Sequence, residues 1–343
     1  MSNQEVEASS KNRVVTTSQK LLSSFGGDAK KTNRLSRYAI VLVWLAMIGV
    51  FMIFIPSTFG SAGNIQSIIS SQVVLVILAV AVTIPLRTGD FDLSIGVVAA
   101  FSATLSAVLS VQHHWSTGLS LLCGIASGAL VGVVNAVVIV GIGVDAFITT
   151  LGMMTLVTGL TYGISGSQVI SGIPHAMSSF ADSVLTWGIS TGAVMGWVLA
   201  LLLWYVFEYT PFGRYLLFVG GAPRVAELSG VRVRWVRAAA FVAAGTLSGF
   251  AGAVLVSSLG VADPSVGSQF MIPPYAAAFL GTTTLQLGRF NIWGSIIGIY
   301  LLATLSTGLE LLGASSWVSN SVDGAALVAA VVFAKLVMGR REA

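Results

Sequence analysis

Long apolar runs with few charges dominate this chain and leave few folds open to it. Of its 343 residues, 55% are hydrophobic and only 9% are Asp, Glu, Lys or Arg, whereas a soluble domain carries about 25% charged residues. Several runs reach about 18 to 22 residues, the length that a helix needs to cross the ~30 Å hydrocarbon core. In lipid only helices and closed barrels satisfy their own backbone, and the runs lack the alternation of barrel strands. The sequence therefore predicts an all-α integral membrane protein.

Polar breaks between the apolar runs divide the chain into about ten expected membrane helices, some of them broken. Residues 1–37 are polar and basic and lack the short apolar core of a signal peptide, which predicts a cytoplasmic tail. The membrane domain is expected over 38–338, and its longest break, 208–237, is expected to be a cytoplasmic loop. The expected spans are 38–55, 65–86, 93–111, 118–140, 146–164, 189–207, 238–259, 272–287, 291–312 and 318–338.

The basic residues indicate how the chain sits in the membrane. If successive spans cross in opposite directions, all 17 Lys and Arg residues fall on one side. This bias is typical of the cytoplasmic side, so both termini are expected in the cytoplasm. Binding to nucleic acid is not expected, because the cations do not cluster on a soluble surface. The cations are Lys11, Arg13, Lys20, Lys30, Lys31, Arg34, Arg37, Arg87, Arg214, Arg224, Arg232, Arg234, Arg237, Arg289, Lys335, Arg340 and Arg341.

Glycines recur every four residues in two of the expected spans. Three of them, Gly124, Gly128 and Gly132, lie in the fourth span. Two more, Gly245 and Gly249, lie in the seventh. Small residues at this spacing let the backbones of two membrane helices approach closely. The pattern predicts a bundle with close helix packing and says nothing about what the protein carries.

The stretch PLRTGDFDLSIG, residues 85–96, places three charges between two apolar runs. Arg87 is interpreted as an anchor that holds this turn at the cytoplasmic surface. Asp92 precedes a helical run and is expected to cap its first turn, because a carboxylate accepts backbone amides that have no partner within the helix. The same carboxylate also suits an acceptor for the hydroxyl groups of a bound molecule, and the sequence leaves both interpretations open.

The glycine and leucine frame of this stretch returns in the second half of the chain. Gly-x3-Leu-x2-Gly begins at Gly89 in GDFDLSIG and again at Gly281 in GTTTLQLG. Both copies lie between a span that runs inward and one that runs outward, which predicts a parallel internal repeat. Glycine-interrupted hairpins at matched positions of two halves point to a translocation pathway between them.

Charge is nearly absent from the middle of the spans. Asp323, in WVSNSVDGAALVAA, is expected in the first turns of the tenth span, where an acid suits the helix N-terminus. A carrier coupled to ions usually keeps an ionisable group within the membrane, because a charge there is costly. The sequence therefore favours a neutral cargo, and an ion-coupled secondary carrier stays an alternative that depends on Asp323.

The loop 208–237 holds five arginines and a short stretch, Pro223 to Leu228, that can form a helix with proline at its start. It is the expected docking surface for a cytoplasmic partner. A basic amphipathic segment lying on anionic lipid is the alternative.

Three stretches of the chain carry a family resemblance. GDFDLSIG is similar to Gly-Gly-Ile-Asp-Leu-Ser-Val-Gly, and VDAFITTLGMM is similar to Pro-Phe-Ile-x-Thr-Leu-Gly-Thr-Met. TPFGRYLLFVGGAPRVAELSGV is similar to Thr-x-Phe-Gly-Arg-x5-Gly-Gly followed by Ala-x-Leu-Ser-Gly-Ile. These motifs belong to the membrane permease subunit of ATP-binding-cassette importers of the ribose-type family, which also serves other sugars, polyols and autoinducer-2. The chain resembles this family from about residue 40 to 338.

The resemblance implies a permease that imports a small neutral sugar-like or polyol solute across the bacterial inner membrane. It implies a homodimer or a heterodimer with a related permease, a cytoplasmic ATPase subunit and a periplasmic solute-binding protein. The chain has no Gly-x4-Gly-Lys-Ser/Thr motif for phosphate binding. We therefore expect it to be no enzyme and to bind no cofactor and no metal, with ATP bound by the partner subunit.

The resemblance also implies roles for particular residues. Arg224 to Gly230 would be the coupling helix that docks in the ATPase, with Arg224 where the family's Glu-Ala-Ala-x3-Gly motif has Glu. The stretch GTTTLQLGRF has fewer glycines than the family's Gly-Gly-x-Ser-Leu-x-Gly-Gly-x-Gly, which predicts a stiffer turn. The expected coupling residues are Arg214, Arg224, Ala226, Glu227, Ser229 and Gly230. The expected substrate-pathway residues are Asp92, Ser94, Thr149 and Thr150.

Overall fold

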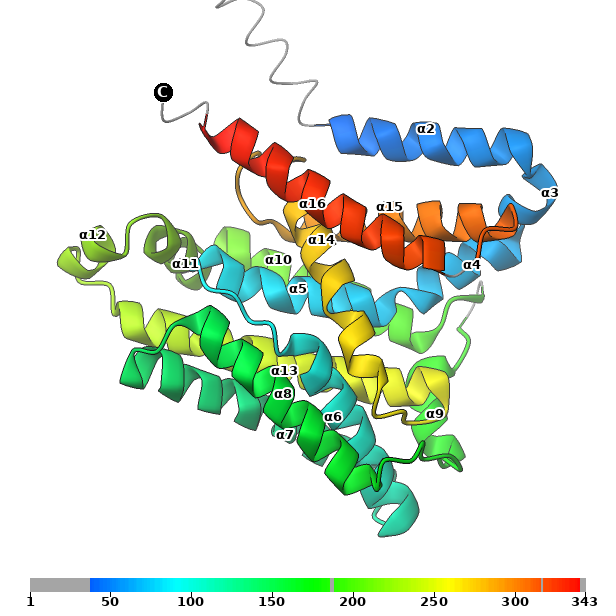
Figure 1. Ribbon diagram of the computed structural model, residues 1–343, viewed down its shortest axis with the longest axis horizontal. Helices are drawn as coiled ribbons and strands as arrows, with labels where there is room; N and C mark the ends of the chain where they lie inside the picture. The colour runs from blue at the N-terminus through cyan, green and yellow to red at the C-terminus, as the bar shows by residue number, and fades with distance from the viewer. Residues whose placement is uncertain (1–37, 186–187, 316, 340–343) are drawn as a thin grey trace, which may run out of the picture.

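The computed structural model describes residues 38–185, 188–315 and 317–339, and the named elements of that part of the chain are all helices (Figure 1). The expected tail 1–37 lies outside the described residues, as do Arg340 and Arg341. Seven helical segments are long and apolar enough to cross a membrane, which confirms an all-helical, multi-pass fold. They are Ala62–Arg87, Ile95–Gln112, Thr117–Ile142, Ala146–Ser165, Thr191–Tyr209, Val233–Leu259 and Ile292–Leu311.

Local signals in the sequence explain where many of the helices begin. Ser61, Asp145, Ser190 and Asn291 each accept the backbone amide of the residue three positions on, as N-caps do. Proline occupies the first position of α3, α11 and α12, where its missing N–H costs nothing. The first half contains α2 (Ala39–Phe54), α3 (Pro56–Phe59), α4 (Ala62–Ser71), α5 (Val73–Arg87), α6 (Ile95–Ala107), η1 (Val108–Gln112), α7 (Thr117–Ala136), η2 (Val137–Ile142), α8 (Ala146–Ser165) and α9 (His175–Asp182). The second half contains α10 (Thr191–Tyr209), α11 (Pro211–Gly221), α12 (Pro223–Leu228), α13 (Val233–Leu259), η4 (Val266–Phe270), α14 (Ile272–Gly281), α15 (Ile292–Leu311) and α16 (Trp317–Gly339).

Two expected spans are shorter than the sequence predicts, so the count of ten stays a prediction. Helix α2 has 16 residues, whereas α16 runs over 23 residues, Trp317–Gly339. Helix α14 has only ten residues. The hydroxyls of Thr282 and Thr283 bond back to the carbonyls of Phe279 and Leu280, an alternative to continued helix. The expected span 272–287 is therefore a half-length helix followed by a turn.

Helix α5 lies at the centre of the bundle. Every residue of α5 except Leu75 is buried, as expected for a helix that is apolar on all sides. In Figure 1, α13 and α10 run alongside it and α14 crosses the bundle obliquely. The short helix α12 stands out at one edge, on the side where α5 ends and α13 begins, and α9 lies at the opposite end.

The glycine pattern produces the close packing that the sequence predicts. A Cβ at Gly128 of α7 would lie 2.5 Å from the carbonyl oxygen of Gly245 and 2.7 Å from the Cα of Gly249, both in α13. One turn on, a Cβ at Gly132 would lie 2.6 Å from the carbonyl oxygen of Phe241. The two helix backbones touch, which no larger residue would allow.

The structure does not reproduce the predicted register of the internal repeat. Gly89 has φ +84°, whereas its predicted counterpart Gly281 is the last residue of α14. The glycine of this stretch with positive φ is instead Gly288, at +74°. Aligned on Gly89 and Gly288, the sequences GDFDL and GRFNI match in type at four of their five positions. Asp92 and Asn291 then correspond, and each accepts a backbone amide at the start of the next helix. A parallel repeat stays a prediction, now in this second register.

Candidate functional site

Arg87, the last residue of α5, is sealed inside the protein. It is 3% exposed, and its guanidinium lies 3.9 Å above the ring of Phe207. Its Nε donates to the carbonyl oxygen of Phe290 at 2.8 Å, and its Nη2 lies 3.6 Å from Oε1 of Glu208. An anchor at a membrane surface keeps its charge in the headgroup region. The structure instead surrounds this cation with protein groups from α10 and from the turn before α15.

Asp90, in the middle of the turn 88–94, forms a two-fold ion pair with Arg237. The Nε of Arg237 donates to Oδ2 at 2.8 Å and its Nη2 donates to Oδ1 at 2.6 Å. The hydroxyl of Thr88 also donates to Oδ2 at 3.0 Å. Bidentate pairs of this kind are among the strong charged hydrogen bonds in proteins. Sequence reasoning missed this pair because its members lie 147 residues apart.

Asp92 is buried and closes a local turn rather than capping α6 as its N-cap residue. Its Oδ1 accepts the backbone N–H of Ser94 at 3.1 Å and the hydroxyl of Ser94 at 2.5 Å. Ser94 is itself the N-cap residue, and α6 begins at Ile95. Burial raises the pKa of the Asp92 carboxyl, and the two hydrogen bonds from Ser94 oppose this rise. The backbone N–H of Asp92 donates to the hydroxyl of Tyr275 in α14 at 3.0 Å.

Side chains of α7 and α8 meet this turn from the other side. The amide of Asn135 donates to the hydroxyl of Ser94 at 3.1 Å, while its own buried Oδ1 has no hydrogen-bond partner among the described residues. The hydroxyl of Thr150 donates to the carbonyl of Phe91 at 3.3 Å. The hydroxyl of Thr149 is also buried, without a partner in the described chain. Of the four expected pathway residues, Asp92 and Ser94 lie in the turn 88–94 and Thr150 is bonded to it, while Thr149 is the neighbour of Thr150 in α8.

The expected coupling residues lie on α11, α12 and the turn that follows. Ala226 of α12 is buried, and Gly230 has φ +83°, which favours glycine. Leu228 is 89% exposed and Val225 is also exposed, so α12 presents apolar side chains outward. Beside them lie four exposed polar residues of the expected set: Arg214, Arg224, Glu227 and Ser229. This mixture of exposed apolar and charged side chains suits a surface that another protein covers.

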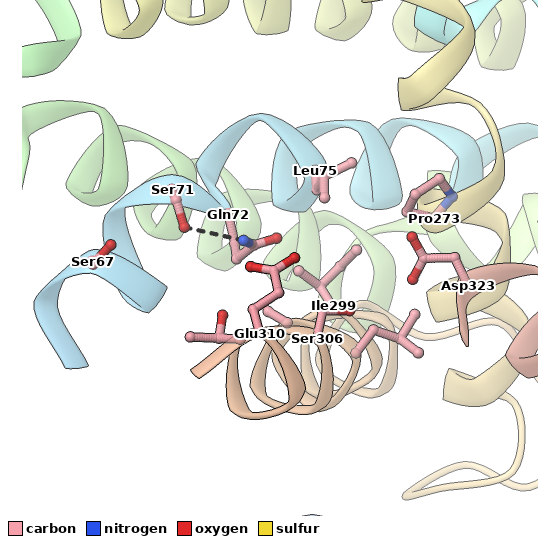
Figure 2. A pocket seen from close by; sticks show the side chains of 12 residues that line it. Ser67, Ser71, Gln72, Leu75, Pro273, Ile299, Ser306, Glu310 and Asp323 are labelled. Carbon is pink, nitrogen blue, oxygen red and sulfur yellow. Dashed lines mark hydrogen bonds between the residues drawn. The ribbon is translucent and has the colours of Figure 1, made fainter. Parts of the chain in front are cut away.

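A polar cavity of about 380 Å³ lies at the opposite end of α5 from Arg87 (Figure 2). Figure 2 shows Glu310 of α15 turned towards Gln72, with Asp323 of α16 beside Pro273. No Lys, Arg or His is among its described lining residues. The lining consists of Ser67, Ser71, Gln72, Leu75, Pro273, Ile299, Leu302, Ala303, Ser306, Thr307, Glu310 and Asp323.

Comparison with known proteins shows which family the chain is similar to. Residues 64–331 match the family described as branched-chain amino acid transport system, permease component. The ribose import permease of Bacillus subtilis is 32% identical over 271 residues, covering 78% of this chain and 84% of that protein. The ribose import permease of Escherichia coli K12 is 30% identical over 295 residues, with coverage of 85% and 91%.

A relative with lower sequence identity is also a sugar transport permease. The D-allose transport system permease of Escherichia coli K12 is 26% identical over 302 residues, covering 88% of this chain and 92% of that protein. No solved structure matched the chain. The family match spans more than three quarters of the chain and includes all three sequence motifs in whole or in part. The chain therefore belongs to the family of ribose-type permease components of ATP-binding-cassette importers, as its sequence motifs predicted.

Proposed function

We propose that this chain is the membrane subunit of an importer that moves a small neutral sugar or polyol across the bacterial inner membrane. Its relatives are named for the import of ribose and the transport of D-allose and fructose. The membrane domain of the proposal is 38–338, with the coupling loop 208–237 within it. ATP would be bound and hydrolysed by a partner subunit, because the chain has no phosphate-binding loop of its own.

The exposed helix α12 is the observation that carries the proposal. It stands at the edge of the molecule, held on the buried Ala226, and presents Val225 and Leu228 outward. A segment that is anchored on one side and apolar on its free side fits the groove of a partner protein. Arg224, Ala226, Glu227, Ser229 and Gly230 would make this contact, with Arg214 on the neighbouring α11.

The position of the arginines indicates how the chain is oriented in the membrane and on which side each remaining partner would bind. Arginines border α12 at the ends of α5 and α13, and positive residues favour the cytoplasmic side. Both termini would then be cytoplasmic, and the cavity near α4 would face the periplasm. A periplasmic binding protein would deliver solute there, and a second permease, identical or related, would complete the membrane dimer.

The substrate pathway of the proposal passes the turn 88–94. Asp92, Ser94 and Thr150 contact one another or the turn backbone, and the hydroxyl of Thr149 has no described partner. These groups can exchange hydrogen bonds with the hydroxyls of a sugar once the surrounding helices separate. Their full burial describes a conformation that is closed at this point.

A second candidate function, an ion-coupled carrier, draws support from the cavity. Two carboxylates, Glu310 and Asp323, line it together with hydroxyl groups. Intramembrane carboxylates often bind the coupling ion of a carrier.

One reconstitution distinguishes the two functions. Proteoliposomes containing the chain, its ATPase and an external binding protein are given radiolabelled ribose, allose or fructose. We expect uptake that requires ATP on the side of the membrane where the ATPase is bound. Uptake should continue when a protonophore is added and should be retained in the Asp323→Asn variant. Uptake that is driven by an ion gradient without ATP and lost in Asp323→Asn would instead establish the carrier.

A further inference from the structure

The two ends of the coupling loop 208–237 are both tied to the turn between α5 and α6. Glu208, at its start, lies 3.6 Å from Arg87 through Oε1 and Nη2. Arg237, at its end, makes the bidentate pair with Asp90. Both ion pairs connect the same two segments of the chain.

The two pairs are shielded from solvent on the side of the turn. The side chains of Arg87 and Asp90 are 1% and 9% exposed, and those of Glu208 and Arg237 are 33% and 31% exposed. Exposed pairs contribute little because water and salt screen them and their side chains stay free. A pair with one buried member holds its geometry better, because leaving the buried charge without a partner is strongly unfavourable. The bidentate pair of Asp90 and Arg237 is therefore the stronger of the two links, and the 3.6 Å contact of Arg87 with Glu208 adds to it.

A backbone contact also joins the coupling loop to the turn, in addition to the two ion pairs. Gly220 of α11 packs directly on the carbonyl oxygen of Arg87, so closely that a Cβ at this position would collide with it. The loop thus contacts the turn at its start, within α11 and at its end. Helix α12 follows α11 after one residue, Ala222, so a displacement of α12 reaches all three contacts.

The turn continues directly into the proposed pathway. Asp90 is followed by Phe91, whose carbonyl accepts from Thr150, and by Asp92, which fixes the start of α6. Phe91 also stacks on Tyr275 and Phe279 of α14 at centroid distances of 6.1 and 6.4 Å. A movement of Asp90 is therefore a movement of the groups that line the pathway.

We propose that the pairs Asp90 with Arg237 and Arg87 with Glu208 are positioning residues that transmit the ATPase stroke from α12 to the turn 88–94. This inference rests on the proposed function of α12. It assigns a mechanical role to Arg87 and Asp90, two of the three charges of the stretch 85–96, and neither of them binds the solute. Both ion pairs remain formed throughout the transport cycle, so the turn 88–94 moves together with the coupling loop 208–237.

The test measures how many solute molecules are imported for each ATP hydrolysed. Asp90→Ala, Arg237→Ala and the double variant are reconstituted with the ATPase and binding protein, using ribose, allose or fructose, whichever the unaltered protein imports. We expect each single variant to hydrolyse ATP while its import per ATP falls several-fold. The double variant should fall no further than either single variant, because both remove the same link.

Controls separate transmission from mere stability. Asp182→Ala removes a carboxylate at the end of α9, outside the coupling loop, one that is exposed and has no described ion pair, and should keep the import ratio unchanged. Asp90→Asn keeps the size of the side chain and a hydrogen-bond acceptor for Thr88, so it guards against failure to fold. It should still lower the ratio, since an amide pairs weakly with Arg237.

Two outcomes overturn the proposal. One is an unchanged ratio in folded Asp90→Asn and Arg237→Ala, even if both transport and hydrolysis decline together. The other is an additive loss in the double variant. If the unaltered protein imports none of the three sugars with ATP, the proposed function itself is wrong. If the unaltered protein imports normally and the variants keep a normal ratio of import to ATP hydrolysis, only the role of the ion pair is wrong.

Discussion

Replacing Gly128 by alanine tests whether backbone contact between α7 and α13 holds the bundle together. The new Cβ would lie 2.5 Å from the carbonyl oxygen of Gly245 and 2.7 Å from the Cα of Gly249. Comfortable separations are about 3.5 Å, so the helices must move apart by about 1 Å. A gap of this size forfeits about a quarter to a half of the attraction between the facing atoms.

The net effect on stability combines this loss with the helix preference of alanine. Overpacking in a well-packed interior costs about 1 to 3 kcal/mol, and the two backbones of this contact have no flexible side chain that could move aside. Alanine in place of glycine recovers up to about 1 kcal/mol within a helix. We expect Gly128→Ala to lower the free energy of unfolding by about 1 to 2 kcal/mol, which for a chain of this length corresponds to a fall of about 1 to 3 °C in melting temperature.

The measurement is thermal unfolding of the purified chain in detergent, followed by tryptophan fluorescence. Gly118→Ala is the matched control, because Gly118 lies in the same helix and a Cβ there would meet nothing within 4 Å. It should melt at or slightly above the temperature of the unaltered protein. If Gly128→Ala melts with the control, the helices do not rely on this contact and the packing argument is refuted.

Three further predictions concern sidedness, docking and the role of Asp92. With Cys123 replaced, a cysteine at Ser116 should react with a membrane-impermeant thiol reagent added to intact cells. A cysteine at Ser229 should react only after the cells are permeabilised, and its reaction in intact cells would refute the proposed orientation. Glu227→Arg, on the exposed face of α12, should abolish uptake and copurification of the ATPase while the chain remains folded in the membrane; persistence of both would place docking elsewhere. Asp92→Asn keeps the Oδ1 acceptor and should retain most uptake, whereas Asp92→Ala leaves the buried N–H and hydroxyl of Ser94 without their acceptor and should lose about 1 to 3 kcal/mol of stability, and folded yield with it. A well-expressed Asp92→Asn protein without uptake would make the carboxylate itself functional.

The sequence by itself determined the class of the fold and several of its local parts. Apolar length predicts membrane helices, and glycine spacing predicts close helix packing, because small residues four positions apart lie on one face of a helix. The stretch Pro223 to Leu228 could be identified as a helix because proline marks its first turn. Each of these features depends on residues that are close together in the chain.

The tertiary structure alone decided how the charges of the turn are used. Hydropathy showed that Arg87 and Asp90 must lie near an end of a span, yet it could not show that Arg87 is buried against Phe207 or that Asp90 is held by Arg237. It also could not show that α14 stops at Gly281, which moves the matching glycine of the second hairpin to Gly288. An ion pair between residues 147 apart depends on how α13 packs beside α5 and α6, and a local pattern holds no information about that packing.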